Sequence, residues 1–131
     1  MDGDFVPNIT IGLCVVEALK RVTVLPLDCH LMIQRPERFA GAFVRAGAYS
    51  VSVHPEAAGD TRQALEDIRA AGGHPSLALK PATPVSAADP YAPLLDMLLI
   101  MTVNPGFSGQ KIMLECLPKY AAARALSLIH I

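Results

Sequence analysis

The sequence predicts an α/β fold in which parallel strands alternate with helices, and three observations support that class. Short apolar runs alternate with helical patterns, and the runs end near His30, His54, Leu79 and Thr102, at intervals of 24, 25 and 23 residues. The runs are largely apolar, as expected for strands that helices cover. Polar or glycine-containing segments follow the runs, where parallel α/β folds place their ligand sites.

Four strands are predicted, at residues 25–31, 49–54, 75–79 and 94–101. The second is rich in β-branched residues, which fit a pleated sheet well. Because strand–helix–strand crossovers are right-handed, such units form either a barrel or a doubly wound sheet. No G-x-G-x-x-G motif follows the first strand, so a dinucleotide-binding sheet is the weaker choice.

Four helices are predicted, at residues 12–22, 36–46, 61–71 and 114–125. Pro36 suits a first helical turn, where its missing N–H costs nothing. Gly47 is typical of the residue just after a helix. Asp60 precedes the third helix and can cap its first free N–H groups.

Composition and charge exclude several classes of protein. The 131 residues carry 11 basic and 12 acidic side chains, which provide no basic face for nucleic acid. Apolar residues make up 52% of the chain, but no stretch approaches the ~20 uninterrupted apolar residues of a membrane helix. Three cysteines without a C-x-x-C pair favour a reducing compartment. The acidic start lacks a signal-peptide layout, so we expect a cytoplasmic protein.

Two histidines are candidate functional residues, because each follows a predicted strand. His30 and His54 lie at the ends of neighbouring strands, so they are expected to share a pocket. An imidazole there can bind a divalent metal or orient a substrate. The alternative is a histidine that is simply hydrogen-bonded among the loops. Two histidines alone also lack the further ligands that zinc requires.

The segment at residues 102–111 is the more informative candidate. Gly106 and Gly109 allow a tight turn with exposed N–H groups, which can hold a phosphate or an enediolate oxygen. A plain strand-to-helix turn is the alternative, although ten residues exceed what such a turn needs. Lys80 follows the third strand and is read as a solvated or substrate-edge lysine rather than a catalytic amine.

Three motifs together resemble the ribulose-phosphate 3-epimerase family. They are Met-Asp-Gly-Asp-Phe-Val-Pro-Asn at 1–8, Asp-Cys-His-Leu-Met at 28–32 and Met-Thr-Val-Asn-Pro-Gly-Phe-Ser-Gly-Gln at 101–110. Leu-Lys-Pro at 79–81 falls in the expected order between them. The resemblance runs to about Arg124, so residues 1–125 are expected to form one partial epimerase barrel, and residues 126–131 a tail outside the family.

The resemblance implies a (β/α)8 TIM barrel of the ribulose-phosphate-binding type, of which this chain supplies strands three to six with their flanking helices. It implies an isomerase of the pentose phosphate pathway that interconverts D-ribulose 5-phosphate and D-xylulose 5-phosphate. Two aspartates would move the proton at carbon 3. A divalent metal, commonly zinc, with iron, manganese or cobalt as alternatives, would stabilise the charge on oxygen. A homo-oligomer is expected, with neither nucleic acid nor membrane as partner.

The same resemblance implies roles for individual residues. His30 matches a metal ligand that also faces the substrate. A loop that follows strand six matches the substrate-binding segment, and three methionines match the lining of the pocket. These residues are Gly106, Phe107, Ser108 and Gly109 for the loop, and Met1, Met32 and Met101 for the lining.

Much of the family's chemistry is expected to lie outside this chain. Asp2 matches a non-catalytic aspartate, because the family's His-x-Asp pair lies a few residues earlier. The second aspartate and the Gly-Ser phosphate site belong to strands seven and eight. Ala82 replaces a usual glycine. Two alternatives stay open: a non-catalytic fragment or isoform that acts by association, and a related hexulose-phosphate 3-epimerase.

We expect residues 126–131 to be a truncation or an assembly artefact. The encoding transcript should therefore diverge from this tail near codon 125, and the genomic sequence upstream of Met1 should encode a His-x-Asp pair. Sequencing across both junctions checks this. Continuous native sequence that supports the same tail would refute it.

Overall fold

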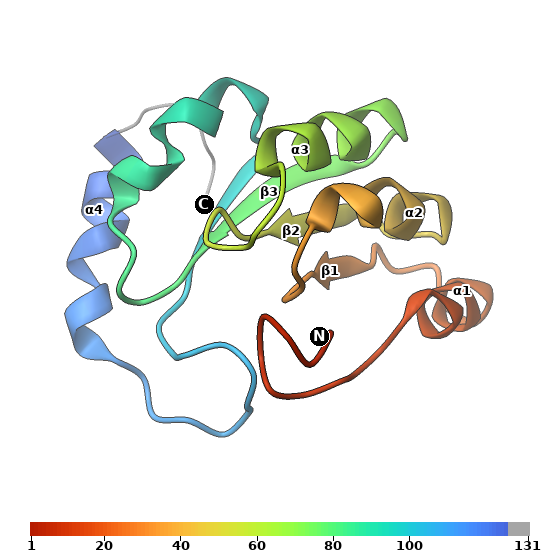
Figure 1. Ribbon diagram of the computed structural model, residues 1–131, viewed down its shortest axis with the longest axis horizontal. Coiled ribbons are helices and arrows are strands. Elements are labelled where there is room, and N and C mark those ends of the chain that lie inside the picture. Colours follow the sequence, from red (N-terminus) through yellow and green to blue (C-terminus); the bar gives the residue numbers. More distant parts are fainter. Residues whose placement is uncertain (126–131) are drawn as a thin grey trace.

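The computed structural model describes residues 1–125, which form one parallel sheet with helices packed against it (Figure 1). The strands are β1 (Asp28–His30), β2 (Ser50–Val53), β3 (His74–Leu79) and β4 (Met97–Ile100). Their order in the sheet is their order in the chain, and all three pairings are parallel. A doubly wound sheet reverses its strand order, so this arrangement is that of a partial barrel.

Helices connect the strands and cover the sheet. The α-helices are α1 (Leu13–Val22), α2 (Ala40–Arg45), α3 (Thr61–Ala70) and α4 (Pro118–Ala125). Three 3-10 segments accompany them, η1 (Pro36–Arg38), η2 (Val85–Leu94) and η3 (Leu114–Cys116). Helices α2 and α3 lie side by side over strands β1 to β3, and α4 lies beyond β4 (Figure 1). Within the described part of the chain, no helix is both long and apolar enough to cross a bilayer.

The two faces of the sheet differ in chemistry because side chains alternate along each strand. In one row, Val51 pairs with Pro75, and the aliphatic side chains of this face join the core formed with α3. The next row carries His30, Ser52 and Ser76, which are aligned across three strands. Both serines are fully buried. The helix-covered face therefore supplies the apolar core, and the other face carries polar groups.

Helix α3 anchors the core. Leu65 and Ile68 are both fully buried against the sheet. The helix begins as the sequence predicts, because the Asp60 carboxylate accepts a hydrogen bond from the Gln63 N–H at 2.9 Å. Its end agrees within one residue, at Ala70.

The amino end of the sheet is closed by a small ion cluster. The Asp96 carboxylate lies 2.7 Å from Arg69 Nη2 and 2.8 Å from His74 Nδ1. Partial burial works to raise the pKa of Asp96, but the hydrogen bonds and positive charge from these two partners lower it overall. The cluster joins α3, β3 and the residue before β4 at the end of the sheet opposite to the carboxyl ends of the strands.

Several predicted boundaries differ from the structure. Strand β1 spans residues 28–30 rather than 25–31, because among residues 1–125 it pairs with β2 alone, and that pairing begins at Ser50. Strand β4 begins at Met97 rather than at 94, because residues 85–94 form the 3-10 segment η2, which the sequence did not predict. The helices expected at 36–46 and 114–125 each divide into a 3-10 turn and an α-helix.

Shortening the core side chain of α3 should destabilise the fold strongly. The substitution Leu65→Ala removes a fully buried side chain and should lower the free energy of unfolding by about 2–5 kcal/mol. Urea denaturation followed by circular dichroism measures this change. The neighbouring Glu66 is exposed on the same helix, and Glu66→Ala should change stability by less than about 0.5 kcal/mol. Equal effects of the two substitutions would show that α3 does not pack as described.

Candidate functional site at the strand tips

Two segments far apart in the sequence meet beyond the carboxyl ends of the strands. The amino-terminal segment and the loop after β4 lie side by side there (Figure 1). Asn8 Nδ2 donates a hydrogen bond of 2.5 Å to the Gly106 carbonyl. Gly106 has a φ of +115°, and an added Cβ would lie 3.3 Å from Val6 Cβ. The close approach and the positive φ together require glycine at this position.

His30 and His54 meet at the ends of β1 and β2, as the sequence predicts. Their Nε2 atoms are 2.8 Å apart, and their ring planes are inclined by 26° with centroids 4.9 Å apart, so the rings meet edge to edge. Phe5 covers the other side of His54 at a centroid distance of 4.8 Å. His54 is thereby only 1% exposed, whereas His30 is partly exposed. Of the two rings, His30 is the one that a ligand can reach.

Glu56 holds the second histidine in place. Its Oε2 lies 3.1 Å from His54 Nδ1, and its Oε1 accepts hydrogen bonds from the Lys80 N–H at 2.8 Å and from the Thr83 hydroxyl. Burial works to raise the pKa of Glu56, but the hydrogen bonds from His54, Thr83 and Lys80 outweigh it and lower that pKa to about 2. Glu56 is therefore ionised at neutral pH.

His30 is neutral at the same pH. Burial lowers its pKa first, and the nearby His54 ring and the amino terminus lower it further, to about 4. A neutral imidazole has one N–H and one lone pair, and only the lone pair can bind a metal or accept a proton. His30 thus has the charge state that a ligand position requires.

Two lysines stabilise the loop that follows β3. Lys80 places its ammonium 3.8 Å from the centre of the Phe5 ring, a cation–π contact. Lys119 of α4 donates hydrogen bonds to the carbonyls of Lys80, Pro81 and Thr83. The loop is therefore held from both sides, and Lys80 lies at the edge of the site.

Asp2 uses its carboxylate to fold the amino-terminal segment. It accepts hydrogen bonds from the backbone N–H groups of Asp4, Phe5 and Gln34, the last at 2.7 Å. Burial opposes a lowered pKa of Asp2, but these N–H donors lower it nonetheless. With its oxygens so engaged, Asp2 acts here as a turn-forming residue.

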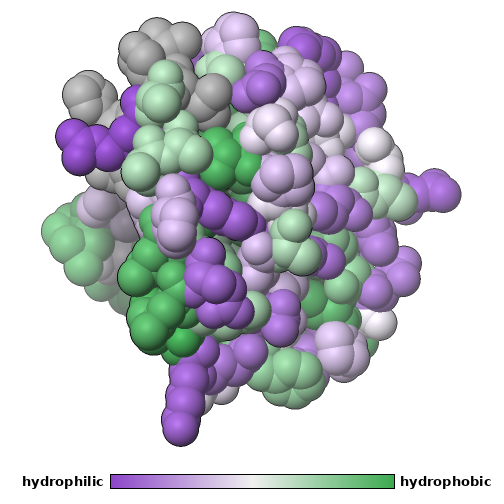
Figure 2. All heavy atoms as spheres, turned by 90° about the vertical axis from the view of Figure 1, so that its left-hand side faces the viewer, coloured by the Kyte–Doolittle hydropathy of each residue, from purple (hydrophilic) through white to green (hydrophobic). Residues whose placement is uncertain are grey.

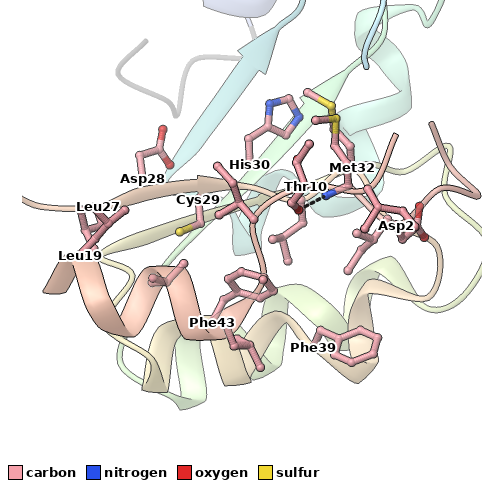
Figure 3. Close-up of a pocket in the computed structure, with 18 of the residues that line it drawn as sticks. Asp2, Thr10, Leu19, Leu27, Asp28, Cys29, His30, Met32, Phe39 and Phe43 are labelled. Atoms are coloured by element: carbon pink, nitrogen blue, oxygen red, sulfur yellow. Dashed lines mark hydrogen bonds between the residues drawn. The ribbon is translucent and has the colours of Figure 1, made fainter. Parts of the chain in front are cut away.

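A cavity of about 860 Å³ runs along the outer edge of β1 (Figure 3). Met1, His30 and Met32 all line it, together with apolar residues of α1 and α2. Figure 3 shows the His30 side chain on one side of the strand and those of Cys29 and Phe43 on the other. The cavity therefore brings together three of the residues proposed from the sequence.

The other proposed residues lie elsewhere. Met101 is buried behind β4 and does not line the cavity. Gly106 is buried under Val6, whereas Phe107 is 61% exposed and the two residues after it are exposed as well. The loop is thus anchored at Gly106 and presents its next three residues, 107–109, at the surface.

The described residues do not by themselves fit a metal ion. Within residues 1–125, no three histidine, cysteine, aspartate or glutamate side chains come together as a ligand cluster. His30 offers one imidazole nitrogen, and Asp2, whose side chain lines the same cavity, accepts hydrogen bonds from backbone N–H donors. A zinc site needs at least three protein ligands.

Sequence reasoning missed Glu56 and Thr83. The signal for Glu56 was its position two residues after a strand-end histidine, in His-Pro-Glu. No local pattern pointed to Thr83, because its contact with Glu56 spans 27 residues.

Comparisons with known proteins identify relatives of this chain. The model of the ribulose-phosphate 3 epimerase family matches residues 1–129, which extends four residues beyond the described part of the chain, into the tail predicted at 126–131. A ribulose-phosphate 3-epimerase of Mycobacterium tuberculosis strain H37Rv is 48% identical over 126 residues, covering 96% of this chain and 55% of that protein. One from Bacillus subtilis is 46% identical and covers 97% and 58%.

A plant relative extends the comparison. The chloroplastic ribulose-5-phosphate-3-epimerase of Arabidopsis thaliana is 49% identical over 112 residues, covering 84% of this chain and 40% of that protein. The chain spans about half the length of the curated relatives it matches. Since the family model covers nearly all of it, this chain belongs to the ribulose-phosphate 3-epimerase family.

Proposed function

We propose that this chain forms the central part of an active site that epimerises a ketopentose phosphate at carbon 3, between D-ribulose 5-phosphate and D-xylulose 5-phosphate. The observation that carries the proposal is the amino-terminal segment, which packs against His54 through Phe5 and against Gly106 through Val6 and Asn8, and so brings the histidine pair and the loop after β4 to one end of the sheet. Membership of the family supplies the reaction class.

The chemistry explains what these residues contribute. Removing a proton next to a carbonyl leaves negative charge on oxygen, and a cation or hydrogen-bond donors must stabilise it. A divalent metal would supply the positive charge that stabilises this oxygen, with zinc proposed first and iron, manganese or cobalt as alternatives. His30 is the proposed ligand from this chain, and the methionines are an uncharged wall. The loop at Gly106, Phe107, Ser108 and Gly109 is proposed to hold the sugar phosphate.

The described residues lack a pair of carboxylates that could exchange the proton. Asp2 is bound by N–H groups, and Glu56 is bound by three donors. We therefore propose that the acid and the base come from parts of the complete enzyme outside this chain. The chain alone is then expected to be inactive.

An assay of the chain and a chimera tests this proposal. The purified chain with Zn²⁺ and D-ribulose 5-phosphate should show no epimerisation above background. A chimera in which residues 1–125 replace the aligned segment of the Bacillus subtilis relative should be active. In that chimera, His30→Ala should reduce turnover to background, because it removes a ligand of the charge-stabilising group.

His74 provides the matched control. It is also a strand-associated histidine, but it lies at the amino end of the sheet with Asp96. His74→Ala should leave the chimera active. Loss of activity in both variants, or robust turnover by the chain alone, would contradict the proposed assignment.

We also propose that the chain associates with other polypeptides, in the family's manner as a homo-oligomer or through its exposed apolar surfaces. Val22 and Val24 beside α1 are 80% and 97% exposed, and Phe107 and Leu114 near α4 are 61% and 64% exposed. Figure 2, which views the side of α4, shows hydrophobic residues gathered in patches between hydrophilic ones. Exposed apolar patches and unpaired strand edges both favour association.

Light scattering after size-exclusion chromatography tests association. The apparent mass should exceed that of one chain and rise with concentration. Replacing Val22 and Val24 by lysine should lower it, because charge opposes burial of that surface. Ala70→Lys, at an exposed position of α3, should have no effect. A monomer with a sharp unfolding transition would refute the proposal.

A further inference from the structure

Three backbone carbonyls in the loop after β3 converge on one ammonium group. Lys119 Nζ donates hydrogen bonds to the carbonyl oxygens of Lys80 at 3.3 Å, of Pro81, and of Thr83 at 2.6 Å. We call these three carbonyls the carbonyl cage. An ammonium has three hydrogens and no acceptor, so the cage satisfies it completely. The Lys119 side chain is partly buried, and the carbonyls replace water around its charge.

The carbonyl cage is built into one compact turn. The Lys80 carbonyl also accepts the Thr83 N–H at 3.0 Å, which closes the turn. Pro81 and Pro84 each have a fixed φ, which limits the shapes that the turn can adopt. Carbonyl oxygens that converge repel one another unless a cation lies between them. The turn is therefore shaped for a cation and needs one.

The opposite side of the same turn presents its hydrogen-bond donors. The Lys80 N–H, at 2.8 Å, and the Thr83 hydroxyl both donate to Glu56 Oε1. Thr83 is thus held twice, by its hydroxyl on the Glu56 side and by its carbonyl on the Lys119 side. The turn lies between a carboxylate that takes its donors and an ammonium that takes its acceptors.

We infer that the carbonyl cage is a binding site for a primary ammonium group, and that Lys119, which occupies it, is a positioning residue for the loops at the strand tips. Lys119 lies on α4, the helix that follows the loop after β4. Its hydrogen bonds therefore tie the end of that loop to the loop after β3.

The amino-terminal segment completes the connection. It contacts the loop after β3 where Phe5 receives the Lys80 ammonium, and it contacts the loop after β4 where Asn8 donates to Gly106. Three segments that border the strand tips are thus joined pairwise. The contact made by Lys119 is the one that a small molecule can replace.

The chemistry of the cage defines its ligand. Lys119→Ala removes a propyl chain and its ammonium, so the emptied space matches n-propylammonium in length and charge. Tetramethylammonium has the same charge but no N–H, and it cannot donate to the carbonyls. The two ions therefore separate recognition by hydrogen bonds from simple neutralisation of charge.

Hydrogen exchange of the 131-residue chain, followed by mass spectrometry, tests the inference. Prolines have no N–H, so exchange in residues 80–84 reports on Lys80, Ala82 and Thr83 alone. Lys119→Ala should speed this exchange at least about tenfold, because hydrogen bonds to a charged group are lost. Added n-propylammonium chloride should restore protection in a saturable manner, and tetramethylammonium chloride should not.

Two further variants serve as controls. Lys119→Met keeps an aliphatic stem without the ammonium, so exchange should be fast both with and without n-propylammonium. Arg124→Ala removes an exposed cation from the same helix, and exchange in residues 80–84 should stay at the wild-type rate. Exchange in β2 and β3 shows whether each variant remains folded.

Three results would overturn the inference. The first is wild-type exchange in Lys119→Met, which also decides the matter if Lys119→Ala does not fold. The second is failure of n-propylammonium to restore protection in Lys119→Ala. The third is equal restoration by tetramethylammonium, since charge alone would then suffice.

The inference rests on the proposed function only for the use of these loops in catalysis. In an active chimera, Lys119→Ala should lower kcat/KM at least about tenfold, and n-propylammonium should restore it. Full activity of that variant overturns the positioning role. An inactive chimera whose exchange responds as expected removes the proposed function but leaves the carbonyl cage intact.

Discussion

Parallel pairing of the four strands in chain order is the constraint on which the site depends. It places the carboxyl end of every strand at one edge of the sheet, so that residues about 24 positions apart become neighbours. His30 and His54 meet for this reason, and so do Glu56 and the loop after β3. The helices on the other face fix the sheet by burying its aliphatic rows.

At that edge, the Glu56 carboxylate connects His54 at the end of β2 with Lys80 and Thr83 in the loop after β3. Glu56 is largely buried, which opposes its charge, yet three hydrogen bonds lower its pKa and hold it ionised. Glu56 contacts His54, which in turn contacts His30, so the carboxylate and His30 are joined only through the His54 ring. Phe5 closes over His54 and also receives Lys80, which excludes water from the middle of the chain of hydrogen bonds.

The two outer strands of the sheet have free edges, and apolar side chains are exposed next to one of them. Strands β1 and β4 each pair on one side only within the described residues. The cavity along β1 is lined mainly by apolar side chains, and exposed aliphatic residues continue from it through residues 22–25. This chain spans 55% and 58% of the two bacterial relatives described above. A complete barrel covers strand edges and apolar surfaces of this kind with further strands and helices.

The sequence by itself determined the alternation of strands and helices and the cap at Asp60, because periodicity and capping are local properties. It also predicted that His30 and His54 lie together, because both stand at the ends of neighbouring parallel strands. The roles of His30 and of the loop at Gly106 as ligands stay predictions. Only the tertiary structure decided where strands end, since a ladder stops where its partner does. It alone revealed Glu56 and Thr83, because hydrogen bonds between loops 24 and 27 residues apart leave no periodic pattern.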